Sequence, residues 1–145
     1  MAVEKTTWDD NRFDPAKPWL RYYPEWTDHS LDYPEKTLVE IYDDNLAANA
    51  DKPATNFFGR TMTYRELDVE VRRAAAGLKR LGVQQGDRVA ILLPNCPQHV
   101  VAFFAVQKLG AIVVEHNPLY TAHELLPQFA DHGARVAVVW DKVAE

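Results

Sequence analysis

The chain has 145 residues, of which 47% are hydrophobic and 26% charged, a size and balance typical of one globular domain. Sixteen basic and 21 acidic residues give a net charge of -5, which argues against a nucleic-acid partner. The single cysteine, Cys96, excludes an internal disulfide framework and a zinc site built on cysteines. No secretory signal is visible, and the longest apolar run, residues 100–106, is far shorter than the about twenty residues of a membrane span. These features favour a cytoplasmic protein.

Residues 1–35 differ in composition from the remainder. They contain four of the nine prolines, no glycine and no helical or strand periodicity. They also contain seven of the sixteen aromatic residues: Trp8, Phe13, Trp19, Tyr22, Tyr23, Trp26 and Tyr33. This composition predicts an extended arm that packs its rings on the chain's own domain, with a partner subunit or a membrane interface as the alternative. Residues 36–145 then form the main folded region.

Helix starts are marked by three Thr-x-x-Glu motifs at residues 37–40, 63–66 and 121–124. In such a capping box the threonine hydroxyl accepts from the N3 amide, and the glutamate accepts from the amide of the cap residue. The first motif predicts a helix from Leu38 to about Asn49. The second predicts a helix from Tyr64 to Leu81, where apolar residues follow a 3.6-residue period. The members of that apolar stripe are Leu67, Val71, Ala74, Ala75, Leu78 and Leu81.

Between these two helices, residues 54–58 and 61–63 flank Gly59-Arg60. Glycine at the first central position of a two-residue loop favours a type II′ turn. The sequence therefore predicts a β-hairpin here.

The second half of the chain alternates short apolar runs with helical stretches. The runs cover residues 89–93, 111–114 and 136–140, and their continuous apolar character is typical of parallel strands buried on both faces. The helical stretches cover residues 97–109 and 122–132. We therefore expect an α/β fold in which a β-α-β-α-β half of a doubly wound parallel sheet follows a helix, a β-hairpin and the aromatic arm. Pro127 breaks the helical rule and predicts a kink or a late helix start.

Several catalytic motifs are incomplete or absent in this sequence. His123-Glu124 opens a zincin pattern, but Pro127 occupies the position of the second histidine. Gly77 and Gly82 have the spacing of a P-loop, but the Lys-Ser/Thr pair is missing. The chain contains neither G-x-G-x-x-G nor G-x-S-x-G. No catalytic residue, cofactor-binding residue or metal ligand is therefore assigned.

The loop that follows the second parallel strand is the best-placed segment for a ligand. In open α/β sheets, ligands bind beyond the carboxyl ends of the strands. This position makes His116, Asn117 and Tyr120 candidates for contact with a substrate. The alternative is that Asn117-Pro118 only sets a turn before the helix cap at Thr121. His99 and His132 are expected at the surface or at helix caps, and Cys96 is expected as a small buried side chain.

Two segments resemble the start of adenylate-forming enzymes: residues 58–67, Phe-Gly-Arg-Thr-Met-Thr-Tyr-Arg-Glu-Leu, and residues 86–95, Gly-Asp-Arg-Val-Ala-Ile-Leu-Leu-Pro-Asn. The segment from Lys108 to Leu125, which contains Asn-Pro-Leu-Tyr-Thr, is similar to long-chain fatty-acid–CoA ligases in particular. The resemblance extends over residues 24–145.

The resemblance implies a two-step ligase that uses ATP, Mg²⁺ and CoA. A fatty-acid carboxylate would form an acyl-adenylate and pyrophosphate, and CoA would then displace AMP. The family's phosphate loop ending in Pro-Lys-Gly, its ribose-binding Asp motif and its adenylation lysine have no counterpart in this sequence. We therefore expect an amino-terminal portion of a longer enzyme that is inactive alone, binds no cofactor by itself and self-associates.

Two alternatives remain open from the sequence. One is a ligase of another carboxylic acid, either aryl or medium-chain. The other is a stand-alone α/β binding or scaffold module without the chemistry. For the parent ligase, peripheral contact with the inner membrane face is an expectation that follows from its lipid substrate.

Overall fold

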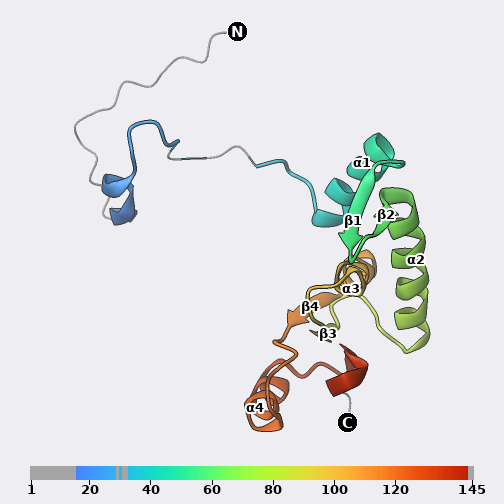
Figure 1. Cartoon of the computed structure of the whole chain (residues 1–145). Coiled ribbons are helices and arrows are strands. Elements are labelled where there is room, and N and C mark those ends of the chain that lie inside the picture. The colour runs from blue at the N-terminus through green and yellow to red at the C-terminus, as the bar shows by residue number, and fades with distance from the viewer. Residues whose placement is uncertain (1–15, 29, 31–32, 144–145) are drawn as a thin grey trace. The chain divides into compact units, whose positions relative to one another are not determined.

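The computed structural model describes residues 16–28, 30 and 33–143 and divides the chain into two compact units, residues 1–35 and 36–145 (Figure 1). In the first unit a 3-10 helix, η1, covers Pro18–Tyr22, so the expected extended arm contains one helical turn. Trp19, Tyr22 and Trp26 expose 52%, 73% and 85% of their surface. Trp8 and Phe13 lie outside the described residues.

The second unit begins with helix α1 (Leu38–Asn49), strands β1 (Pro53–Phe57) and β2 (Arg60–Thr63), and helix α2 (Tyr64–Arg80). Both helices start where their capping boxes predict. The carboxylates of Glu40 and Glu66 accept hydrogen bonds from the backbone N–H groups of Thr37 and Thr63 at 2.6 and 2.8 Å. Tyr42 is the buried residue of α1, whereas α2 buries five side chains along one face.

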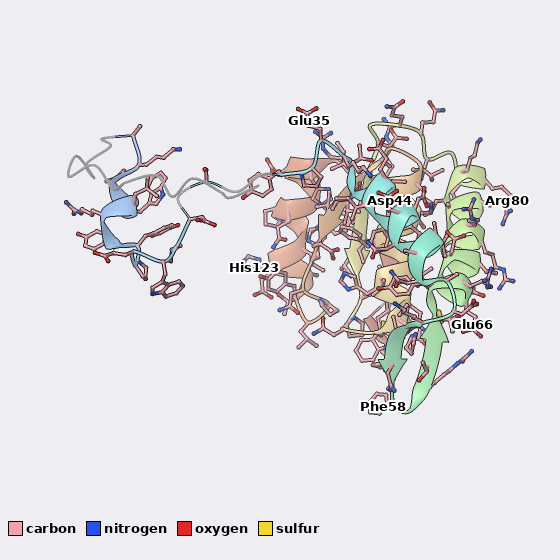
Figure 2. All side chains as sticks on the ribbon, turned by 90° about the horizontal axis from the view of Figure 1, so that it is seen from above. Glu35, Asp44, Phe58, Glu66, Arg80 and His123 are labelled. Atoms are coloured by element: carbon pink, nitrogen blue, oxygen red, sulfur yellow. The ribbon has the colours of Figure 1, made fainter. Side chains whose placement is uncertain are left out.

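The hairpin turn differs from the predicted type. Phe57 pairs with Arg60, so Phe58 and Gly59 are the two central residues. Their φ angles are 48° and 82°, and positive φ at both positions defines a type I′ turn, not type II′. Figure 2 shows Phe58 at the tip of the hairpin, where its side chain is 95% exposed. The prediction placed Gly59 first in the loop, whereas Phe58 occupies that position in a left-handed conformation.

The parallel sheet of the prediction is confirmed. Strands β3 (Arg88–Leu92), β4 (Ile112–Glu115) and β5 (Val136–Val139) form a sheet in the order β4-β3-β5, and β3 pairs in parallel with both neighbours. Helices α3 (Pro97–Lys108) and α4 (Ala122–His132) connect the strands. The α3 connection runs from β3 to β4, and the α4 connection runs back from β4 past β3 to β5. Right-handed crossovers that run in opposite directions lie on opposite faces of the sheet. The arrangement is therefore half of a doubly wound sheet.

The core lies where α2 and α3 pack together on one face of the sheet (Figure 1). Val89 and Ile91 of β3 are fully buried there, against Leu78 of α2 and against Ala102 and Val106 of α3, in two neighbouring clusters. β3 alone is buried on both faces, because it is the central strand. β4 and β5 are only half-buried, so the expectation that all three strands are covered on both faces was wrong.

Two further expectations need correction. Leu81, assigned to the apolar stripe of α2, follows the helix as its C-cap and is 70% exposed, because the chain turns away there. Helix α4 begins at Ala122, directly after its capping box, which excludes a late start, one of the two alternatives predicted for Pro127. The hydrogen bonds between Thr121 and Glu124 define the start of the helix. Pro127 does not disturb this start, because its missing N–H leaves only the carbonyl of His123 without a helical partner. No side chain of α4 is buried.

Candidate functional site

The carboxyl edge of the sheet is extended by one residue past both outer strands. The His116 N–H donates to the carbonyl of Ile91 at 2.9 Å, and the Trp140 N–H donates to the carbonyl of Leu92 at 3.0 Å. These two bonds continue the ladders on both sides of β3. They hold the starts of the two loops that follow β4 and β5 at the same edge, which is the edge predicted from the sequence for a ligand.

His116 is buried at this edge, with 7% of its surface exposed. Its Nδ1 lies 2.9 Å from Oε1 of Gln128, and its Nε2 lies 3.0 Å from Nε2 of His132. The ring of Phe129 stacks on it, with centroids 5.0 Å apart and an angle of 13° between the planes. Both ring nitrogens of His116 are therefore occupied by residues of α4.

Asn117 and Tyr120 form a turn in front of α4. The Oδ1 atom of Asn117 accepts a hydrogen bond from the backbone N–H of Leu119 at 3.0 Å, and its carbonyl accepts from the N–H of Tyr120 at 3.1 Å. Asn117 thus sets a turn before the helix cap at Thr121, which is the alternative that the sequence left open. The Tyr120 side chain is 40% exposed, which leaves its ring accessible.

A second polar contact at this edge was not predicted from the sequence. His99, in the first turn of α3, places Nε2 3.0 Å from Oε1 of Glu115 and Nδ1 3.3 Å from the carbonyl of Leu93. It was expected at the surface or at a helix cap. The pairing with Glu115 joins two segments sixteen residues apart, and no local pattern in the sequence indicates such a contact.

His132 was likewise expected as a surface or capping residue. Its Nδ1 accepts a hydrogen bond from the backbone N–H of Ala134 at 3.0 Å, as a cap would. Its pairing with His116 was missed, because sixteen residues separate the two side chains and only the crossover of α4 brings them together. Burial, followed by the effect of His116, lowers the pKa of His132 below its ordinary value of 6.5.

A separate charged cluster joins α1, α2 and α3 away from the edge. Lys108 Nζ lies 2.6 Å from Oδ1 of Asp43 and 3.9 Å from Oδ1 of Asp68, and 4.9 Å from the ring centroid of Tyr42. Asp68 also accepts from Nε of Arg72 at 2.6 Å. Burial and the neighbouring Asp68 raise the pKa of Tyr42. These contacts hold three helices together, which is a structural role.

A half-open groove of about 840 Å³ lies between the hairpin, α2 and α3. Its apolar lining includes Met62, Leu78 and Val101, and its polar lining includes Glu66 and Glu70. Within residues 16–28, 30 and 33–143, no helix is long and apolar enough to cross a membrane. The same residues contain no group of three or more His, Cys, Asp or Glu side chains that could hold a metal ion.

Comparison with known proteins identifies the family. A family profile described as AMP-binding enzyme matches residues 42–145. The chain belongs to the AMP-binding enzyme family. It is 44% identical over 125 residues to the long-chain-fatty-acid–CoA ligase of Bacillus subtilis (strain 168), a match that covers 86% of this chain and 22% of the relative. The chain therefore spans about a fifth of the length of that curated relative.

Two further similar proteins are named as CoA ligases of 4-coumarate and of anthranilate. The chain is 48% identical over 80 residues to 4-coumarate–CoA ligase 3 of Oryza sativa subsp. japonica, which covers 55% of this chain and 14% of that protein. The solved structure of the anthranilate CoA ligase AuaEII in complex with anthranoyl-AMP matches with a TM-score of 0.68 and 36% identity, covering 72% of this chain and 20% of that one. The expected adenylate-forming fold is thereby confirmed.

Proposed function

We propose that this chain is the amino-terminal portion of an ATP-dependent long-chain fatty-acid–CoA ligase. The observation that carries the proposal is the 44% identity over 86% of the chain to a relative with that name. The Asn-Pro-Leu-Tyr-Thr segment at residues 117–121 supports the same subgroup. Residues 36–145 would form the first part of the large adenylate-forming domain, with residues 1–35 as an arm.

The proposed reaction has two steps. An oxygen of the fatty-acid carboxylate attacks the α-phosphorus of ATP, the bond to pyrophosphate breaks, and an acyl-adenylate forms. The CoA thiolate then attacks the acyl carbon, AMP leaves, and the thioester forms. Mg²⁺ belongs to the proposed chemistry of the whole ligase, but the described residues offer no cluster that fits it, and no step is assigned to it in this chain.

The contribution of this chain would lie at the carboxyl edge of its sheet. Tyr120 offers an exposed ring there, and Asn117 shapes the turn that presents it. His116 would act on the same edge by fixing the start of the loop. Ligands of open α/β sheets bind at this edge, which supports these three residues as the substrate-edge group.

The test is acid-dependent exchange between ATP and pyrophosphate, catalysed by the whole ligase that contains this chain. We expect palmitate to support exchange better than octanoate or 4-coumarate. Faster exchange with 4-coumarate would replace the proposal by an aryl-acid ligase, the candidate that the rice and AuaEII relatives favour. The purified 145-residue chain should give no exchange, and measurable exchange would show that it contains a complete adenylation site.

Two finer properties follow from the same proposal. The cytoplasmic ligase would contact the inner membrane face through the exposed rings of Trp19, Tyr22 and Trp26, because aromatic side chains favour the membrane–water interface. Co-sedimentation with lipid vesicles should fall in a W19A/W26A variant and stay unchanged in the control variant F58A. Retention of binding by W19A/W26A would exclude the arm as the contact.

Self-association of the isolated chain would use the free edges of β4 and β5, which have no neighbour among the described strands. Sedimentation velocity should show oligomers whose share grows with concentration. A monomer at every concentration would contradict this property without affecting the ligase proposal.

A further inference from the structure

The contact between His116 and His132 has an unusual chemistry. The two Nε2 atoms lie 3.0 Å apart, which is hydrogen-bond distance. A bond between two imidazole nitrogens holds one proton, so one ring must donate and the other must accept. The remaining partners of the two rings decide which ring donates.

The backbone fixes the direction of the whole chain of bonds. The N–H of Ala134 donates to Nδ1 of His132 at 3.0 Å, so that nitrogen must present its lone pair. A neutral His132 then carries its proton on Nε2 and donates it to Nε2 of His116. His116 in turn carries its proton on Nδ1 and donates to Oε1 of Gln128 at 2.9 Å. The Gln128 amide nitrogen ends the chain by donating to the carbonyl of Glu124 at 2.9 Å.

Every donor in this series of hydrogen bonds meets an acceptor only while both imidazole rings are neutral. A proton added to Nδ1 of His132 would face the N–H of Ala134, and one added to Nε2 of His116 would face the N–H of His132. The same bond from Ala134 argues against a metal ion between the rings, because a metal would need lone pairs on both Nε2 atoms. The charged groups that act on His132 are Asp131 on α4 and Arg88 on β3, which have opposite signs.

The attachment of α4 to the sheet depends on this series of hydrogen bonds. The helix buries no side chain, and Pro127 removes one of its backbone hydrogen bonds. Its carboxyl-terminal half meets the end of β4 through Gln128, Phe129 and His132, and all three contact the ring of His116. The His116 ring is therefore the point at which α4 is fastened to the sheet.

We propose that His116 and His132 form a pH-sensitive latch between β4 and α4, closed while both rings are neutral and opened by a single added proton. Opening would also release the loop that begins at His116 and carries Asn117 and Tyr120. The inference is independent of which acid the ligase activates, because it concerns only how this chain holds α4.

The lowered pKa of His132 is consistent with a contact that holds only while the ring is neutral. A histidine whose pKa is lower in the folded state binds its proton more readily once released. The latch is therefore fully closed above pH 6.5, the ordinary value of the group, and weakens as the pH falls from 6.5 towards the lowered pKa.

The test is amide hydrogen exchange of the full 145-residue chain, expressed as protection factors at pH 7.5 and pH 5.5. We expect the protection of residues 128–132 to fall several-fold, in the direction that the lowered pKa of His132 sets, while that of α2 stays constant. The control variant H123Q changes an exposed histidine of the same helix and should keep the pH effect. The double variant H116L/H132L, with an apolar contact in place of the titrating one, should lose it.

A second measurement applies even if the double variant does not fold. Nitrogen-15 shifts of the imidazole rings at pH 7.5 should identify the Nδ1–H tautomer for His116 and the Nε2–H tautomer for His132. The opposite tautomers, or protection of α4 that does not change with pH in the unaltered chain, would each overturn the latch.

Discussion

Helices α2 and α4 begin alike and are held in different ways. Each starts with a Thr-x-x-Glu capping box whose glutamate accepts from the cap amide at 2.8 Å. α2 then buries Leu67, Val71 and Leu78 against the core. The side chains of α4 are at most half-buried, and this helix contacts His116 through polar bonds and through the stacked ring of Phe129. A cap therefore decides where a helix begins, while side-chain burial decides how firmly the helix is held.

The greatest loss of stability is expected from a substitution in the apolar face of α2, compared with one on α4. L67A removes a leucine that is 3% exposed and should lower the free energy of unfolding by about 3 kcal/mol, because it leaves a cavity. L126A removes a leucine of α4 that is 70% exposed and should change it by less than about 0.5 kcal/mol. Urea unfolding followed by circular dichroism measures both. Similar losses in the two variants would show that α4 is as deeply packed as α2.

The charged cluster beneath α2 should have the next largest effect. D68A removes a largely buried carboxylate that pairs with Arg72 and lies 3.9 Å from Lys108, and we expect a loss of about 2 kcal/mol. D51A, which removes an exposed carboxylate paired with Arg65 at 2.9 Å, is the matched control and should cost about 0.5 kcal/mol or less. Equal losses in urea unfolding would contradict a special role for the buried site.

Removing the N-cap hydroxyl tests how the stability of a helix start is coupled to the packing of that helix. T63A and T121A should each weaken a helix start by about 1 kcal/mol. In T63A the loss should appear in global unfolding, because α2 is part of the core. In T121A it should appear mainly as faster amide exchange within α4. A global loss in T121A as large as in T63A would mean that α4 unfolds together with the core.

The smallest expected effect is the pH dependence of the caps. Hydrogen bonds from the threonine N–H groups lower the pKa of Glu40, Glu66 and Glu124 below the ordinary 4.5. A carboxyl with a lowered pKa stabilises the fold above pH 4.5 and loses that contribution as the pH falls through its folded pKa. E66Q should therefore make the unfolding midpoint less dependent on pH between 5 and 3. The control E35Q changes a glutamate that caps no helix and should leave the dependence unaltered.

The sequence was sufficient for the elements whose determinants are local. The capping boxes and the 3.6-residue period located α1 and α2 to within one residue of their ends, and the apolar runs located all three parallel strands. The turn at Phe58-Gly59 was assigned the wrong type because residue preference ranks phenylalanine low where φ is positive. The half-exposure of β4 and β5 was missed because the apolar run of a central strand and that of an outer strand look alike in sequence.

The place of the candidate site stays a prediction, and its internal contacts were not predicted from the sequence. The rule that ligands lie beyond the carboxyl ends of strands selected the loop at His116, Asn117 and Tyr120. The pairs His116–His132 and His99–Glu115 each join residues sixteen positions apart. Such contacts depend on the path of a crossover helix, which no periodicity encodes.

The order of the packed elements along the chain has a consequence for biosynthesis. α2, β3 and α3 follow one another within residues 64–108 and pack on each other, so short loops are enough to bring them together. Domains fold as units during synthesis, from the amino-terminal side onwards. A nascent chain leaving the ribosome can therefore bury Val71, Val89 and Val106 against their neighbours before α4 and β5 have emerged from it.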